Sequence, residues 1–339
     1  MDYDELRTEL MDFLREGPDP SSFDELALTI FNFQFASNKG YQAYCGALGV
    51  APESITRWQE IPALPCDAFK LSPPPFCGDS SGAERSFLSS GTTGESRSRH
   101  YFRELDTYQA AIRTGWREGG LPPLTRTAFV SRPPGSQPES SLMFMFETLA
   151  GDSISPPHWL LDGDGSPSYP HFGEEPLILF GTSLNMLDYF SQAPLEFALP
   201  PETWVFQTGG FKGLQREISP TQILDLLTGA GVATERIINE YGMTELSSQA
   251  YAIGAGSAHK CPPWMRVQVI NPETGLAQDH GVEGYLEVVD LANLGSALAV
   301  RTQDIAVAVN DHEFVLQGRD AGALPRGCSR SPEAALTTP

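Results

Sequence analysis

Hydrophobic residues along this chain first follow a helical spacing, then alternate between buried runs and amphipathic segments, and finally form short β runs. Leucine and phenylalanine recur at helical spacing over residues 2–16, and residues 22–48 predict a second helix. Residues 51–80 are rich in proline, which removes backbone donors and fixes φ, so they predict a rigid, irregular connector.

The middle of the chain alternates short apolar runs with amphipathic segments, as strands and helices do. Residues 151–175, rich in glycine, proline, serine and aspartate, predict a surface loop. The alternation predicts a parallel sheet of the α/β class, in which ligands bind beyond the carboxyl ends of the strands. The first expected strand ends at residue 88, and the others cover residues 127–130, 177–180, 204–207 and 236–239. The expected helices cover residues 105–118, 141–149, 184–190 and 219–228.

From residue 264 onward the helical pattern stops. Turn signals at residues 271–275 and 310–311 separate β runs and predict an antiparallel sheet or small barrel. These runs cover residues 265–270, 283–289, 297–301, 305–309 and 313–316. We therefore divide the chain into a helical and proline-rich region (1–80), an α/β core (81–262), a β-rich subdomain (263–320) and a tail (321–339).

Composition and charge limit the classes of binding partner that this protein can have. The formal net charge is −21, and such a surface repels nucleic acid and anionic membranes, so we expect neither as a partner. No apolar run approaches a membrane span, and the acidic N-terminus lacks the features of a signal peptide, which predicts a cytoplasmic protein. The five cysteines are scattered, so neither a disulfide framework nor a zinc site is expected.

A Ser-Ser-Gly-Thr-Thr-Gly sequence directly follows the first expected strand of the core. Glycine permits tight turns and close approach to a ligand, successive N–H groups form an anion-binding nest, and the hydroxyls add donors for phosphate oxygens. An ordinary surface turn is the alternative. No Gly-Lys-Ser/Thr follows, so the sequence differs from the loop of P-loop NTPases. The residues of this candidate phosphate loop are Ser89, Ser90, Gly91, Thr92, Thr93 and Gly94.

A second motif, Tyr241-Gly242-Met-Thr244-Glu245, lies far downstream. Together the two motifs resemble those of the acyl-adenylate-forming superfamily, whose members activate carboxylates with ATP. The resemblance implies that residues 89–94 wrap the β- and γ-phosphates, Tyr241 lies along the adenine, Thr244 holds the α-phosphate and Glu245 holds Mg²⁺. A hard cation prefers a carboxylate with phosphate oxygens, which fits Glu245. The alternative for Glu245 is a helix cap or a salt bridge.

Further positions match the superfamily pattern less completely. Gly209 and Gly210 resemble the glycines that line the adenine and acyl pocket, although a plain strand-to-helix turn is the alternative. Asp304 and Arg319 occupy positions that bind the ribose in the superfamily, although Gln303 replaces the usual glycine.

The superfamily loop usually continues to a lysine that meets phosphate. The continuation here is Ser-Arg-Ser-Arg-His, and Arg97, Arg99 and His100 remain open as the source of that charge. An exposed basic loop is the alternative.

The end of the chain departs from the superfamily. The resemblance implies the N-terminal-domain-like fold, parallel sheets with helices plus a small antiparallel β subdomain, but the C-terminal lid domain and its lysine are expected to be absent. Instead Arg326-Gly-Cys328-Ser resembles the tail of the acyl-protein synthetase family, the LuxE-like component of bacterial fatty acid reductase. Residues 61–70 are similar to that family too. An adjacent arginine favours the nucleophilic thiolate. An unremarkable tail thiol is the alternative.

These resemblances imply an ATP- and Mg²⁺-dependent enzyme that adenylates a carboxylic acid, with a fatty acid favoured, and transfers the acyl group to Cys328. An acyl-reductase would be the partner that takes it on. One alternative is transfer to coenzyme A, a carrier protein or an amine, and another is a non-catalytic adenylate-binding subunit. The segments 144–146 and 204–208 are apolar and aromatic, which suits fatty or aromatic acids.

Overall fold

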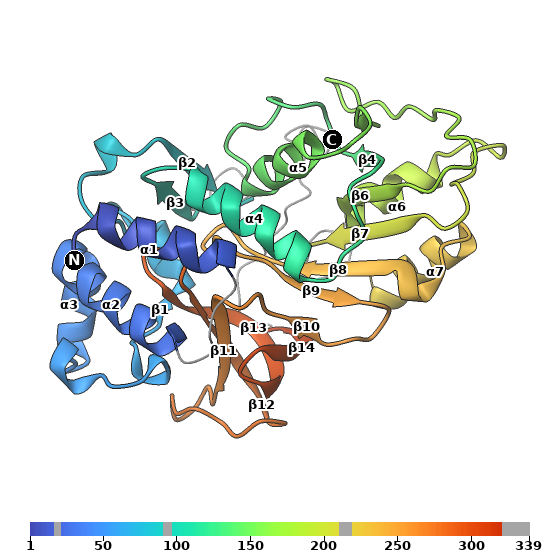
Figure 1. Ribbon diagram of the computed structural model, residues 1–339. Helices are drawn as coiled ribbons and strands as arrows, with labels where there is room; N and C mark the ends of the chain where they lie inside the picture. Colours follow the sequence, from blue (N-terminus) through green and yellow to red (C-terminus); the bar gives the residue numbers. More distant parts are fainter. Residues whose placement is uncertain (17–21, 91–96, 210–218, 321–339) are drawn as a thin grey trace, which may run out of the picture.

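A computed structural model describes residues 1–16, 22–90, 97–209 and 219–320. Twelve strands of this part form one mixed sheet, and two more form a separate hairpin (Figure 1). The sheet order is β11-β12-β13-β14-β10-β9-β8-β7-β6-β4-β5, with β1 (Leu64–Pro65) pairing parallel to β13. Every helix of the described ranges is too short or too polar to cross a membrane.

One half of the sheet is parallel, as the alternation of elements predicts. Helices α4 (Asp106–Glu118) and α5 (Ser141–Gly151) cover one face, while α6 (Ser183–Ser191) and α7 (Pro220–Gly229) cover the other. Consecutive strand residues face opposite helices: Phe129 packs with α4 and α5, and Val130 packs with α6. The parallel strands are β4 (Thr127–Val130), β5 (His158–Trp159), β6 (Ile178–Thr182), β7 (Trp204–Thr208) and β8 (Ile237–Tyr241).

The other half is antiparallel, which confirms the expectation for the region after residue 264. Strands β11 to β14 form a meander in sequence order. Residues 297–301 and 305–309 were expected as two strands, but residues 299–310 form one long strand, and two short strands connect the halves. The strands are β9 (Ala250–Ile253), β10 (His259–Lys260), β11 (Met265–Ile270), β12 (Glu283–Asp290), β13 (Ala299–Asn310) and β14 (Glu313–Arg319).

Three helices, α1 (Tyr3–Glu16), α2 (Ser22–Ser37) and α3 (Lys39–Ala47), precede the irregular connector. The single helix expected over residues 22–48 is divided, because Asn38 is extended and its Oδ1 accepts a hydrogen bond from the Tyr41 N–H at 3.1 Å. The 3₁₀ turns of the chain are η1 (Pro52–Ser54), η2 (Trp58–Glu60), η3 (Cys66–Lys70), η4 (Ser80–Gly82) and η5 (Thr234–Arg236).

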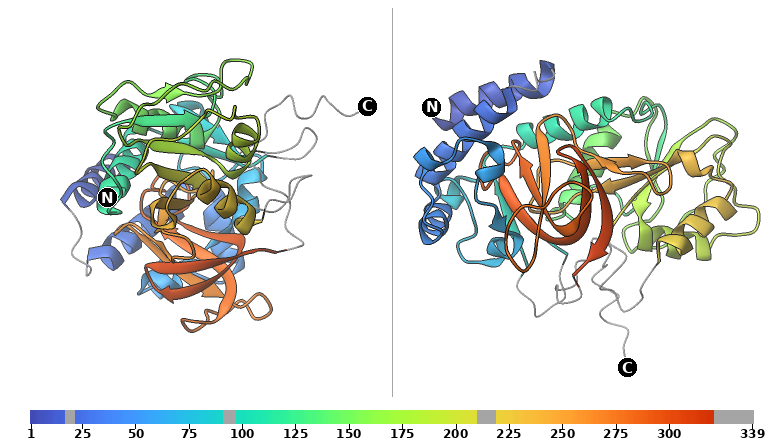
Figure 2. Two further views of the ribbon diagram at one scale, coloured as in Figure 1. Left: turned by 90° about the vertical axis from the view of Figure 1, so that its right-hand side faces the viewer. Right: turned by 90° about the horizontal axis from the view of Figure 1, so that it is seen from below.

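The N-terminal helices support the loop between β12 and β13. The fully buried Gln34 donates from Nε2 to the carbonyls of Asn293 at 2.8 Å and Leu294 at 3.0 Å, and its Oε1 accepts from the Leu298 N–H at 2.9 Å. Asn38 Nδ2 donates to the Ser296 carbonyl at 3.0 Å. Figure 2 shows the blue helices beside the orange strands, at the opposite end of the molecule from α7.

We predict that Gln34→Leu lowers the free energy of unfolding by about 2–4 kcal/mol, because three buried backbone groups lose their partners. Urea denaturation of Gln34→Leu and of the matched control Gln42→Leu, whose side chain is exposed, measures the effect. Equal stability of the two variants would contradict the stabilising role of Gln34 at the loop between β12 and β13.

Candidate functional site

The candidate phosphate loop begins where the expected strand ends. Strand β2 (Arg85–Leu88) pairs with β3 (Arg99–Phe102) in an antiparallel hairpin. The Ser89 N–H donates to the Ser98 carbonyl at 2.9 Å, and the Ser98 N–H donates to Ser89 Oγ at 2.9 Å, so the hairpin continues beyond the strands. Gly91, Thr92, Thr93 and Gly94 lie outside the described residues, whereas Ser89 and Ser90 lie at the base of the loop.

His100 joins this hairpin to the second motif. Its Nδ1 lies 2.8 Å from the Thr244 carbonyl, and its Nε2 lies 2.8 Å from Ser296 Oγ. A carbonyl only accepts, so Nδ1 carries the proton and Nε2 accepts from the Ser296 hydroxyl. Complete burial lowers the pKa of His100 to about 4, so the ring is neutral at pH 7.

Because its ring is neutral, His100 does not supply the positive charge that a lysine after the phosphate loop supplies in the superfamily. Arg99 Nη1 donates to Ser86 Oγ at 2.9 Å, back along the hairpin. Arg97 donates from Nε to the Ser89 carbonyl and lies 3.7 Å from Glu139. Of the three candidates, Arg97 therefore lies closest to the base of the loop.

Two motifs from different halves of the sheet meet at Tyr241. Its hydroxyl donates to Asp304 Oδ2 at 2.8 Å, across 63 residues of sequence. Asp304 pairs with Arg319 in the register of β13 and β14. Arg319 Nη2 in turn donates to Gln303 Oε1 at 2.8 Å, so the residue in place of the expected glycine holds the arginine.

A buried polar network holds the loop from Gly242 to Gln249. Asp290, fully buried, accepts from the Ser247 N–H at 2.9 Å and from Ser248 Oγ at 2.7 Å. Burial raises the pKa of Asp290 to about 6, while these donors favour its ionised form. Asn293 Nδ2 donates to the Glu245 carbonyl at 2.9 Å. The sequence analysis did not identify Asp290 or Asn293, and nothing in their local pattern singles them out.

Glu245 lies in a loop between β8 and β9, so the alternative in which it caps a helix is wrong. Its side chain is 1% exposed, next to Thr244, which is 9% exposed. Both motif residues are therefore buried.

The strand ends beside this motif carry polar side chains. Gln207 Nε2 donates to Asn239 Oδ1, and Ser183 Oγ donates to Gln207 Oε1 at 3.2 Å. Thr208 Oγ1 donates to Glu240, whose pKa burial raises to about 7. These contacts link the carboxyl ends of β6, β7 and β8.

Two motif glycines are described. Gly209 has φ of +108°, a conformation that other residues rarely adopt, and it turns the chain at the end of β7. A Cβ on Gly242 would lie 2.2 Å from Glu240 Oε1, so a larger residue there would require the Glu240 side chain to move. Gly210 lies outside the described residues.

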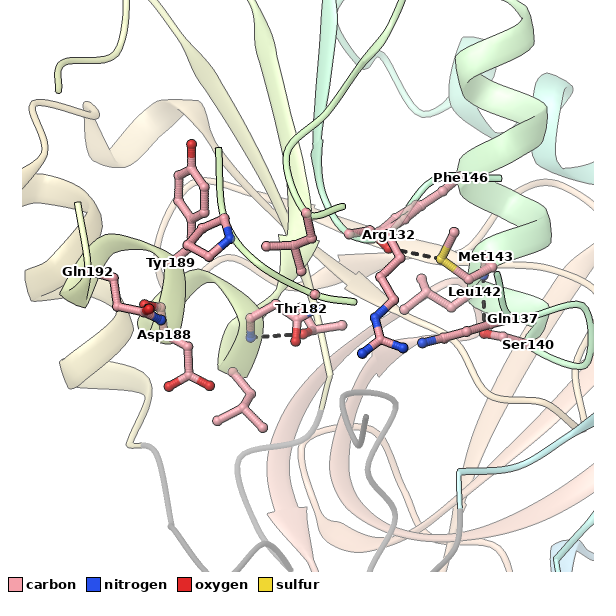
Figure 3. A pocket seen from close by; sticks show the side chains of 16 residues that line it. Arg132, Gln137, Ser140, Leu142, Met143, Phe146, Thr182, Asp188, Tyr189 and Gln192 are labelled. Atoms are coloured by element: carbon pink, nitrogen blue, oxygen red, sulfur yellow. Dashed lines mark hydrogen bonds between the residues drawn. The ribbon is translucent and has the colours of Figure 1, made fainter. Parts of the chain in front are cut away.

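A cavity of about 240 Å³ opens at the ends of β4 and β6 (Figure 3). Met143 and Phe146 of α5 form an apolar wall, and Thr182 follows at the end of β6. Arg132 and Asp188 also line it. The cavity is thus apolar on one wall and charged near its rim.

Cys328 lies outside the described residues. Cys45, Cys66 and Cys77 are buried, and burial raises the pKa of Cys45 to about 11 and of Cys77 to about 12. Burial also raises the pKa of Cys261. Raised pKa values make Cys45, Cys77 and Cys261 poor nucleophiles at neutral pH.

Solved structures that are similar to this chain include a CoA ligase and MatB. A 2-hydroxyisobutyryl-CoA ligase in complex with 2-HIB-AMP and CoA is similar over 92% of this chain and 71% of its own, with 12% identity and a TM-score of 0.67. The same ligase in the postadenylation state with 2-HIB-AMP is similar over 88% and 68%, with 12% identity and a TM-score of 0.66. ATP-bound MatB from Rhodopseudomonas palustris matches 73% of this chain and 50% of its own, with 14% identity and a TM-score of 0.49.

No protein-family model matches the sequence, and no curated protein matches it either. The similarity to 2-hydroxyisobutyryl-CoA ligase shows the fold: this chain shares the α/β architecture of that ligase over 92% of its own residues. That result confirms the expected fold class.

We predict that His100 makes stability depend on pH. Its pKa of about 4 in the folded state lies below the unfolded value of 6.5, so its contribution is present above pH 6.5 and is lost as the pH falls toward 4. The free energy of unfolding of the wild type, relative to His100→Asn, should fall by about 2 kcal/mol between pH 7 and pH 5.

Urea denaturation of both proteins at each pH measures this difference. The comparison cancels the titration of Asp290 and Glu240, which the two proteins share. His171→Asn, which alters an exposed ring, is the control and should show no such change. A pH-independent difference for His100→Asn would refute the buried neutral ring.

Proposed function

We propose that this protein activates a carboxylic acid with ATP, forming an acyl-adenylate and pyrophosphate. The observation that carries the proposal is the hydrogen bond from Tyr241 to Asp304, which brings together an adenine-binding and a ribose-binding motif. The contact of His100 with Thr244 also joins the β2–β3 hairpin, which carries Ser89, to the segment of the second motif. The fold of a ligase that was solved with an acyl-adenylate supports the proposal.

In this reaction a carboxylate oxygen attacks the α-phosphorus of ATP, and pyrophosphate leaves with the bonding electrons. Tyr241 lies along the adenine, Asp304 and Arg319 bind the ribose hydroxyls, and Thr244 donates to the α-phosphate. Ser89 and Ser90, with the rest of the loop and Arg97, bind the β- and γ-phosphates. Gly209 and Gly210 leave room for the adenine and the acyl group. Positioning and charge stabilisation are the main means of catalysis in phosphoryl-type displacements.

The described side chains would hold a magnesium ion only if nucleotide phosphates supplied further ligands. No cluster of three or more His, Cys, Asp or Glu side chains in the described ranges could hold a metal by itself. Mg²⁺ in nucleotide sites is typically held by one or two carboxylates and by phosphate oxygens, and Glu245 supplies such a carboxylate beside Thr244. When bound there, the ion neutralises phosphate charge.

The acyl group then passes to Cys328. The thiolate attacks the carbonyl carbon of the acyl-adenylate, AMP leaves, and a thioester forms. This step rests on the resemblance of the tail to acyl-protein synthetases, which also implies a reductase as the next acceptor and a fatty acid as the substrate. Transfer to coenzyme A or to an amine is the competing outcome, and it differs in leaving no acyl group on the protein.

We predict that Glu245→Gln abolishes acid-dependent pyrophosphate release, lowering kcat by at least about 100-fold, since the ion that neutralises phosphate charge loses its carboxylate ligand. A coupled pyrophosphate assay over a panel of acids measures it. Glu283→Gln, which alters an exposed carboxylate at the start of β12, is the matched control. Unchanged pyrophosphate release by Glu245→Gln would contradict the assignment of Glu245 as a magnesium ligand.

We predict that Cys328→Ser keeps pyrophosphate release and loses a hydroxylamine-labile acyl adduct. Intact-mass measurement after incubation with ATP, Mg²⁺ and an acid detects the adduct. Cys261→Ser serves as the control, because burial keeps that thiol protonated. An adduct that survives in Cys328→Ser would refute the tail mechanism and leave the adenylation step standing.

A further inference from the structure

A series of side-chain contacts begins in the 3₁₀ turn η3 and ends at Arg319, which the proposed function places at the ribose. Asp67 Oδ1 pairs with Lys70 Nζ at 2.7 Å. Asp67 Oδ2 accepts from Gln303 Nε2 at 2.8 Å, across 236 residues of sequence. Gln303 Oε1 in turn accepts from Arg319 Nη2 at 2.8 Å. One side chain of β13 therefore bridges η3 and the end of β14.

The chemistry of the two partners fixes the orientation of the Gln303 amide. An ionised carboxylate only accepts hydrogen bonds, so the amide nitrogen must face Asp67. A guanidinium only donates, so the amide oxygen must face Arg319. The reversed amide would place acceptor against acceptor and donor against donor, and both bonds would be lost. Asp67 thus determines which end of the Gln303 side chain meets Arg319.

The backbone holds Gln303 in place for this role. Its carbonyl accepts from the Asp320 N–H at 3.1 Å, which joins the ends of β13 and β14. Strand β1 pairs in parallel with β13 shortly before Gln303, where Pro65 lies opposite Arg301, and η3 follows β1 directly. Strand pairing therefore brings Asp67 close to Gln303, and the bond between their side chains does not have to draw two separate segments together.

The same 3₁₀ turn also contacts the other side of the proposed nucleotide site. The Phe69 ring packs edge-on against the His100 ring, with the two centroids 5.3 Å apart. His100 contacts the Thr244 carbonyl in the second motif. Each of the two parts of the site is thus linked to η3 through one intermediate side chain.

Fixing Arg319 before the nucleotide arrives matters because arginine has a long side chain with many rotamers. A guanidinium that is ordered only when the ligand binds loses conformational entropy at that step, which lowers affinity. A hydrogen bond that holds it in the free protein removes part of this loss. Glycine, which Gln303 replaces in the superfamily pattern, has no side chain to make such a bond.

We propose that Gln303 is a positioning residue: oriented by Asp67, it holds Arg319 where the guanidinium binds the ribose hydroxyls of ATP. This inference rests on the proposed function and adds η3 to the nucleotide site. Gln303 acts through Arg319 and not on the reacting atoms, so its effect falls on nucleotide affinity and not on the chemical step.

The test measures calorimetric binding of ATP and of 2′,3′-dideoxy-ATP, each with Mg²⁺, to the wild type and to Gln303→Met. Methionine keeps the length of the side chain and removes the amide. We expect ATP affinity to fall about tenfold, the effect of one hydrogen bond to a charged group. Affinity for 2′,3′-dideoxy-ATP should stay within about twofold. In pyrophosphate release, KM for ATP should rise with kcat unchanged.

Further variants distinguish positioning from a general structural role. A double variant of Gln303→Met and Arg319→Met should lose no more ATP affinity than Arg319→Met alone, because Gln303 acts only through Arg319. Asp67→Ala should weaken ATP binding in the same direction as Gln303→Met, since the amide is then free to turn over. Gln42→Met, which alters an exposed glutamine of α3, is the matched control.

The outcomes separate this inference from the proposed function. Additive losses in the double variant, equal losses for both nucleotides, or wild-type ATP affinity in Gln303→Met would each overturn the inference. ATP binding that depends on Gln303, without pyrophosphate release from any acid, would overturn the proposed function and leave the positioning of Arg319. No ATP binding by the wild type would overturn both.

Discussion

The burial of the Asp290 carboxylate is the constraint on which the centre of this molecule depends. A carboxylate in the interior needs hydrogen-bond donors, and the Ser247 N–H and the Ser248 hydroxyl supply them. Those donors belong to the loop that carries Thr244 and Glu245, so satisfying the charge also fixes the motif. The adjoining Asn293 is held in turn by Gln34 of α2. Stability and site geometry therefore share one set of bonds, from the N-terminal helices to the nucleotide motif.

The same arrangement explains why the site contains a neutral histidine. His100 has one ring nitrogen on the Thr244 carbonyl and the other on the Ser296 hydroxyl, which leaves no place for a second proton. The ring therefore acts as a spacer of fixed length between the hairpin and the motif loop. Under the proposed function, the positive charge for phosphate would come from Arg97, whose Nε donates to the Ser89 carbonyl.

Much of the fold could be predicted from the sequence, because buried strands and amphipathic helices each have a clear period. Residues 127–130 and 265–270 form the expected strands over their full length. The failures have local causes: Asn38 prefers to cap a helix and divides a continuous pattern, and the polar pair Gln303 and Asp304 interrupts the apolar run of β13. The short strands β9 and β10 contain too few residues to show a period.

The site could be predicted only where a motif is local. Tyr241 and Asp304 were both identified, yet their hydrogen bond depends on the pairing of strands far apart in sequence. Asp290, Asn293 and the cavity have no local signature, since each depends on side chains from several elements.

The position of Tyr241 has a mechanical consequence. Strand direction changes immediately beyond β8, and Asp304 lies on the antiparallel side of that change. Any twist of one half of the sheet against the other must stretch or release this contact. A nucleotide bound at this boundary would connect the two halves of the sheet. Its binding would therefore reduce the mobility of the whole sheet, and not only that of the binding loops.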